Sequence, residues 1–285
     1  MFDTRLSQAV AGFAARMLPL SETDLEREWI WKDHDEEGVR FAFFVTLQEL
    51  RDLAVTLAAR RPTLTPAQHI LGQYHAAYLD LQAAVLGISN EAAERTPAEG
   101  EWSIKRAYAH ILGTEINFTI VVRYALEGHR AGTWSPDRFS DAEADRLAGI
   151  SDEEYLALIN GPLDGLIAYD RELHRRILND FSTITDEELM LPSTYWEETR
   201  FSIRHRLHRY EAHFVQHTVQ IDKTLEAIGQ PPSESKRLLR KIYSALAEVE
   251  AMMIGMVKID DAAISATASS ISERTNEIES LLERS

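Results

Sequence analysis

The chain has 285 residues, of which 45% are hydrophobic, so it can bury a sizeable core. Its 30 lysines and arginines are outnumbered by 46 aspartates and glutamates, and the resulting net charge of −16 repels the phosphates of nucleic acids and of anionic membrane surfaces. There is no cysteine, which excludes disulfides, cysteine nucleophiles and thiolate metal ligands. We therefore expect no nucleic-acid or membrane partner, and a bound metal would need His, Asp, Glu or carbonyl ligands.

Helix-forming residues dominate the composition, and only 9 prolines and 13 glycines interrupt the chain. This composition predicts an all-α fold. No stretch reaches the ~18 consecutive apolar residues that a membrane span requires. The start, MFDTRLSQAV, lacks the basic beginning and apolar run of a signal peptide. We expect a soluble, cytoplasmic protein.

Residues 1–64 are predicted to form an N-terminal helical extension, which ends near Arg61-Pro62. A short helix is expected at 2–17, and residues 21–24 have the composition of a cap or loop. A second helix is expected at 39–60, where apolar residues recur at helical spacing.

Residues 65–230 are predicted to form a four-helix bundle. Long helical patterns run over residues 65–86, 103–127, 151–179 and 202–229. Thr65-Pro66 and Ser151, with Glu154 three residues later, are helix-start signals. Gly161-Pro162 should kink or break the third helix. The linkers at 129–150 and 181–201 are long enough to be functional loops, and the first could carry a short helix.

Residues 231–285 are predicted to form a C-terminal helical hairpin, with one long helix as the alternative. Apolar residues alternate at three- and four-residue spacing over 239–256 and again over 264–282, and the register skips near Asp260-Asp261. Such narrow seams are typical of helix–helix packing. The bundle or a second subunit could cover them, so a homodimer is one expectation.

The histidines of the last bundle helix are the most informative candidates. His213 and His217 are one turn and about 40° apart on a helix, so both can face one metal ion. They lie on the apolar stripe of that helix, where unpaired imidazoles would be costly. The pattern also arises by chance, and Phe214 stands where a zincin motif has its glutamate. His205 and His208 point in other directions.

His110 on the second bundle helix is a third candidate ligand. Small or polar residues share its face, so its imidazole could reach across the bundle interior; these are Ala107, Thr114 and Asn117. Taken alone, a helical histidine is more often an ordinary core or surface residue.

Two segments resemble motifs of the DinB-like (YfiT-like) superfamily of metal-binding four-helix bundles. Residues 102–115, from Trp102-Ser103 through His110 to Glu115, are similar to its second-helix motif. Residues 211–221, with His213 and His217, are similar to its fourth-helix motif. Over roughly 65–230, the resemblance implies a three-histidine site, typically for zinc or nickel, with an open coordination position. Some members of the superfamily are transferases or isomerases that use small thiols such as mycothiol or bacillithiol.

Three interpretations of function follow. The first is a metal-dependent enzyme on His110, His213 and His217, either a transferase with a small-thiol cosubstrate or a hydrolase. The second is a metal-stabilised binding module without catalysis, and the third is a structural bundle without metal. Candidate catalytic helpers are Tyr210, Gln220 and Glu115, the last as a partner for a ligand imidazole, although packing roles are the simpler expectation. Three tryptophans near loops could line a substrate pocket, although they more often cap a core: Trp102, Trp134 and Trp196.

Overall fold

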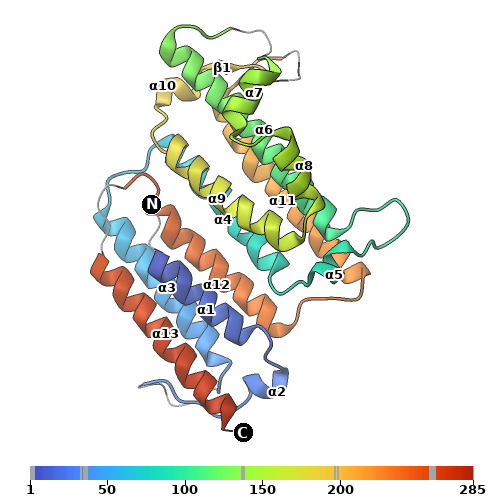
Figure 1. Cartoon of the computed structure of the whole chain (residues 1–285). Coiled ribbons are helices and arrows are strands. Elements are labelled where there is room, and N and C mark those ends of the chain that lie inside the picture. Colours follow the sequence, from blue (N-terminus) through green and yellow to red (C-terminus); the bar gives the residue numbers. More distant parts are fainter. Residues whose placement is uncertain are drawn as a thin grey trace. The chain divides into compact units, whose positions relative to one another are not determined.

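The computed structural model describes residues 4–32, 34, 38–135, 139–195, 197, 199–256 and 261–284. These residues form thirteen helices and one two-stranded sheet, and the fold is all-α as the sequence predicts. No helix among the described residues is both long and apolar enough to pass through a membrane. The chain divides into two compact units (Figure 1). Unit 2 is the continuous segment 64–230, whereas unit 1 combines residues 1–63 with 231–285.

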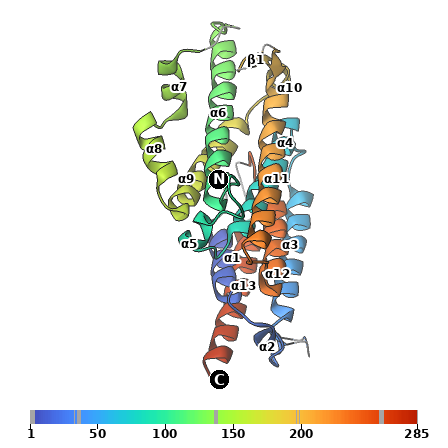
Figure 2. The same cartoon turned by 90° about the vertical axis from the view of Figure 1, so that its right-hand side faces the viewer.

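Unit 2 is a bundle of four long helices, α4, α6, α9 and α11 (Figures 1 and 2). Their bounds are Pro66–Val85, Ile104–Ala131, Leu163–Phe181 and Ile203–Ala227. Helix α11 packs against both α4 and α6, and α9 completes the bundle against the same two helices. Because α11 has neighbours on two sides, two of its faces are buried. His213 and His217 lie on the face that meets α6.

Short elements complete unit 2. Its small helices are α5 (Asn90–Glu94), α7 (Asp141–Ala148), α8 (Asp152–Asn160) and α10 (Asp186–Leu189). Strands β1 (Pro192–Ser193) and β2 (Phe201–Ser202) pair in antiparallel fashion just before α11. Thus the first long linker carries a helix, and the second carries a helix and a two-stranded hairpin.

The helix boundaries follow local signals in the sequence. The side chains of Thr65, Ser103 and Ser151 accept hydrogen bonds from backbone N–H groups of the first turns of α4, α6 and α8. The chain breaks at Gly161-Pro162, so the expected third helix is the pair α8 and α9.

Helix α6 is longer than the glycine at position 128 predicts. It passes through Gly128 and ends at Gly132, which adopts the left-handed conformation. A Cβ at Gly128 would lie 2.9 Å from the Cα of Trp134. Gly128 therefore allows the chain at Trp134 to pack closely against the helix, and it does not end the helix.

Unit 1 contains four longer helices, α1, α3, α12 and α13, with the short α2 (Glu22–Leu25) between the first two. The long helices span Thr4–Met17, Phe41–Arg60, Glu234–Ala251 and Asp261–Glu283. Helix α12 packs mainly on α3, and α13 mainly on α1. The two C-terminal helices, α12 and α13, are separate. N-terminal helices of the same chain cover their apolar faces, so these faces do not by themselves require a second subunit. The register skip at Asp260 lies outside the described residues.

The core of unit 1 contains a buried arginine, Arg274 of α13. Its guanidinium donates to Oγ1 of Thr46 at 2.6 Å and to Oε1 of Glu49 at 2.7 Å, and it lies over the ring of Trp31. Its side chain is fully buried. This ion pair ties α13 to α3 and to the loop that precedes α3.

We predict that Arg274→Ala destabilises unit 1 by about 3 kcal/mol, because it leaves the Glu49 carboxylate partly buried without its cation. Native-state hydrogen exchange of peptides from α3 and α13 would measure the loss for this unit. The matched control is Arg51→Ala, whose ion pair with Glu248 is exposed on both sides and should contribute less than about 1 kcal/mol. Equal effects of the two substitutions would contradict the prediction.

Candidate metal centre

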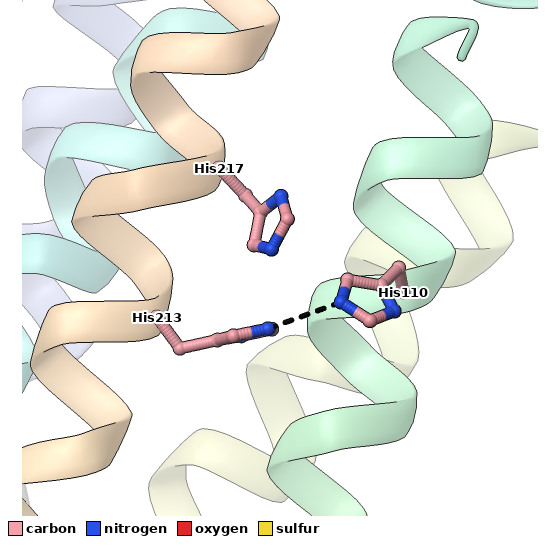
Figure 3. Close-up of side chains that lie close together, drawn as sticks. All are labelled: His110, His213 and His217. Atoms are coloured by element: carbon pink, nitrogen blue, oxygen red, sulfur yellow. Dashed lines mark hydrogen bonds between the residues drawn. The ribbon is translucent and has the colours of Figure 1, made fainter. Parts of the chain in front are cut away.

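Three imidazoles converge between α6 and α11 (Figure 3). His110 lies in the second turn of α6, and His213 and His217 lie on successive turns of α11. The Nε2 atoms of His110 and His213 are 3.2 Å apart, and one nitrogen from each of the three rings lies within 4.8 Å of the others. The structure thus brings together the three residues that the sequence singles out.

The ligand atoms have the chemistry and the spacing for a divalent metal ion. Four ligands held tetrahedrally at 2.0–2.1 Å from zinc are about 3.4 Å from one another, close to the observed separation of His110 and His213. Imidazole nitrogen suits zinc and nickel alike, so the donors do not distinguish the two metals. Three protein ligands leave a coordination position open.

Burial favours the neutral, metal-binding form of the imidazoles. His213 and His217 are 7% and 6% exposed, whereas His110 is at the exposed edge of the cluster. Burial, with the His217 and His110 rings nearby, lowers the pKa of His213 to about 3. Burial and His217 also lower the pKa of His110. The low values mean that at neutral pH a metal ion would displace few protons from these two rings.

Gln220 holds one of the imidazoles in place. Its Oε1 atom lies 2.7 Å from Nδ1 of His217. Since the amide oxygen only accepts, Nδ1 carries the proton and donates, which leaves Nε2 free to bind a metal. Gln220 is therefore a positioning residue for the cluster.

An aromatic residue and an arginine cover one edge of the site. The Trp102 ring meets His110 edge-on with centroids 5.0 Å apart, and it stacks at 6.2 Å on His217. The guanidinium of Arg106, one turn before His110, lies 5.1 Å over the same indole ring. Sequence reasoning missed Arg106, although its four-residue spacing from both Trp102 and His110 indicates a shared face.

The structure places the other two helper candidates away from the imidazoles. The Tyr210 hydroxyl is buried 3.0 Å from Thr119 Oγ1, and burial raises its pKa well above the usual range. Glu115 accepts a hydrogen bond from Tyr74 and lies 3.9 Å from His174. No described contact connects Glu115 to a ligand imidazole, because its position in α6 directs it to α4 and α9 instead.

The tryptophans do not share one pocket. Trp102 precedes α6 and Trp134 follows it, and a helix of 28 residues is about 42 Å long. Trp134 stacks on His129 at a centroid distance of 4.6 Å. Of the two candidates that the structure describes, Trp102 lies at the candidate site and Trp134 does not; Trp196 lies outside the described residues.

The fold and the cluster define a class of protein, a four-helix bundle with three convergent imidazoles that could hold a divalent cation. The family model of the DinB superfamily matches residues 73–221, a segment that includes all three histidines. The chain therefore belongs to the DinB superfamily. No curated protein and no solved structure was found to match it.

We predict that Gln220→Leu weakens zinc binding at least about tenfold, because His217 loses the hydrogen bond that orients its ring. Competition with a chromophoric chelator would measure the affinity. The control is Gln216→Leu on the same helix, an exposed residue without a described contact to the imidazoles, which should leave the affinity unchanged. An unchanged affinity in Gln220→Leu would exclude the orienting role.

Proposed function

We propose that this chain binds one zinc or nickel ion through His110, His213 and His217 and acts as a transferase for a small-thiol cosubstrate. The observation that carries the proposal is the convergence of three imidazoles with one open edge, at exposed His110. When bound, the metal supplies a Lewis-acidic position that favours the thiolate form of a thiol. The chain has no cysteine of its own, so the sulfur must come from a second molecule.

Positive charge near the cluster supports an anionic ligand such as a thiolate. The charge of Arg209, one turn before His213, acts on that ring and helps to lower its pKa. Arg106 adds a second guanidinium beside Trp102. Cationic neighbours stabilise a thiolate relative to a thiol. Trp102 offers an apolar face for the rest of the cosubstrate.

A hydrolase is the less favoured candidate. Metal-dependent hydrolases of the zincin type use a glutamate as general base beside the metal. Phe214 stands where that motif has its glutamate, and Glu115 is engaged with Tyr74. A metal-stabilised binding module without catalysis remains the main alternative, and thiol binding distinguishes it from the transferase.

The metal content of the purified, untagged chain tests the first part of the proposal. We expect about one zinc or nickel ion per wild-type chain and loss of the ion in His110→Ala, His213→Ala and His217→Ala, since three ligands define the site. Elemental analysis gives the count, and His208→Ala is the control because His208 lies on the same helix outside the cluster. A metal-free wild-type chain that cannot be reloaded would overturn the site.

Thiol coordination tests the second part. We expect that a small thiol added to the cobalt-substituted protein produces a sulfur-to-cobalt charge-transfer band in the near-ultraviolet, because an open position would accept the thiolate. The corresponding alcohol is the control ligand and should produce no such band. If the metal is bound and the thiol leaves the spectrum unchanged, the binding-module interpretation is favoured over the transferase.

A further inference from the structure

A second group of buried polar side chains lies in the core of unit 2. Its centre is a pair of carboxyl groups, Glu115 of α6 and Asp170 of α9, which are 1% and 0% exposed. The two groups are close enough that each shifts the pKa of the other. Around them stand side chains from α4, α6 and α9, namely Tyr74, His75, Tyr78, Gln82, Tyr108 and His174.

Two of the four carboxyl oxygens of the pair have no hydrogen-bond partner among the described residues. Tyr74 donates to Oε1 of Glu115, and Tyr108 donates to Oδ2 of Asp170. Gln82 donates to the same Oδ2 atom at 3.4 Å. The remaining oxygens, Oε2 of Glu115 and Oδ1 of Asp170, are buried and receive no hydrogen from any other described group. Ionised carboxylates only accept hydrogen bonds, so these two oxygens can be paired with each other only if a proton lies between the groups.

The side chains around the pair do not supply enough positive charge to balance two ionised carboxylates. Nδ1 of His174 lies 3.9 Å from Oε1 of Glu115, is buried and has no hydrogen-bond partner. Burial and His75 lower the pKa of His174 well below its usual value, so this ring is neutral. His75 Nδ1 lies 2.9 Å from His174 Nε2. Arg171, on α9, is the one cation described as acting on Asp170.

The other titratable groups that face the pair are phenols. On α4 these are Tyr74 and Tyr78, on α6 Tyr108, on α9 Tyr169, and on α11 Tyr210, whose ring lies against Tyr74. Burial raises the pKa of Tyr108 well above its usual value, so it remains a neutral donor. Two negative charges would therefore face each other in the bundle core with little compensation.

We propose that Glu115 and Asp170 form a buried proton-binding site, in which the two carboxyl groups share one proton and carry a single negative charge. The proton belongs mainly to Glu115, because Asp170 receives the hydrogen bonds of Tyr108 and Gln82 and the field of Arg171. Burial and the neighbouring Asp170 accordingly raise the pKa of Glu115 well above its usual range. Close sets of three metal-ligating atoms occur among the described residues only at the three-histidine cluster, which favours a proton over a metal ion here.

Proton release on unfolding in urea at pH 8.5 tests the proposal. The folded wild-type chain holds the shared proton, whereas the unfolded carboxyl groups are ionised, so unfolding releases it. We expect Glu115→Gln to release about one proton per chain fewer than the wild type. Its amide can still accept from Tyr74 and donate to Asp170, so the hydrogen bonds survive without the proton. Glu99→Gln, at an exposed loop carboxylate, should release as many protons as the wild type.

The stability of the folded chain should depend on pH, because the folded and unfolded chains bind different numbers of protons. Between the unfolded and folded pKa values of the pair, the folded chain binds more protons, so its stability falls as the pH rises. In that window the unfolding equilibrium constant should rise by up to about tenfold per pH unit in the wild type and less in Glu115→Gln. Equal proton release by the wild type and Glu115→Gln would overturn the proposal.

A second measurement does not depend on the folding of a variant. At pH 7.5 the native wild-type protein should show the infrared carbonyl stretch of a protonated carboxyl group, and Asp170→Asn or Glu115→Gln should change it. Absence of that band in the wild type would overturn the proposal. More than one metal ion per wild-type chain, with one retained when His110, His213 and His217 are replaced, would overturn it in favour of a metal at the pair.

Discussion

The packing of α6 against α11 is the contact on which the candidate site depends. The two helices run in opposite directions (Figure 1), and His110 near the beginning of α6 meets His213 and His217 in the middle of α11. Neither helix holds the whole ligand set, since α6 contributes one histidine and α11 two. The site therefore exists only when the bundle is assembled, and metal binding would stabilise the same contact.

Unit 2 places polar groups in its interior in two different ways. The imidazole cluster has an exposed edge at His110 and a stacked Trp102, so a ligand can reach it. The Glu115 and Asp170 pair is closed on all sides, and its donors come from the bundle itself. Buried polar groups are costly unless they are paired. In our proposals, a bound metal ion pairs the imidazoles of the histidine cluster, and a shared proton pairs the carboxyl groups of Glu115 and Asp170.

The order of the helices along the chain sets the two units apart. Unit 2 is one continuous segment, so even the pairing of its first and last long helices, α4 and α11, closes within residues 64–230. Unit 1 pairs α1 with α13 and α3 with α12, so its first and last helices must find each other across the whole chain. Such long-range pairing forms late because loop closure must come first. The metal-site unit can thus assemble before unit 1 is complete.

Local patterns in the sequence predict the long helices, most of their ends and the three candidate ligands, but not short helices such as α2, α5 and α10. Caps such as Thr65 and Ser151 act within one turn, and the spacing of His213 and His217 fixes their common direction, so both are local properties. The partner that each inward side chain meets depends instead on tertiary packing. Tyr210 and Glu115 lie at core positions, yet they meet Thr119 and Tyr74 rather than the imidazoles. Helical periodicity gives the direction of a side chain around its own axis, but the choice of neighbouring helix depends on the packing of the whole bundle.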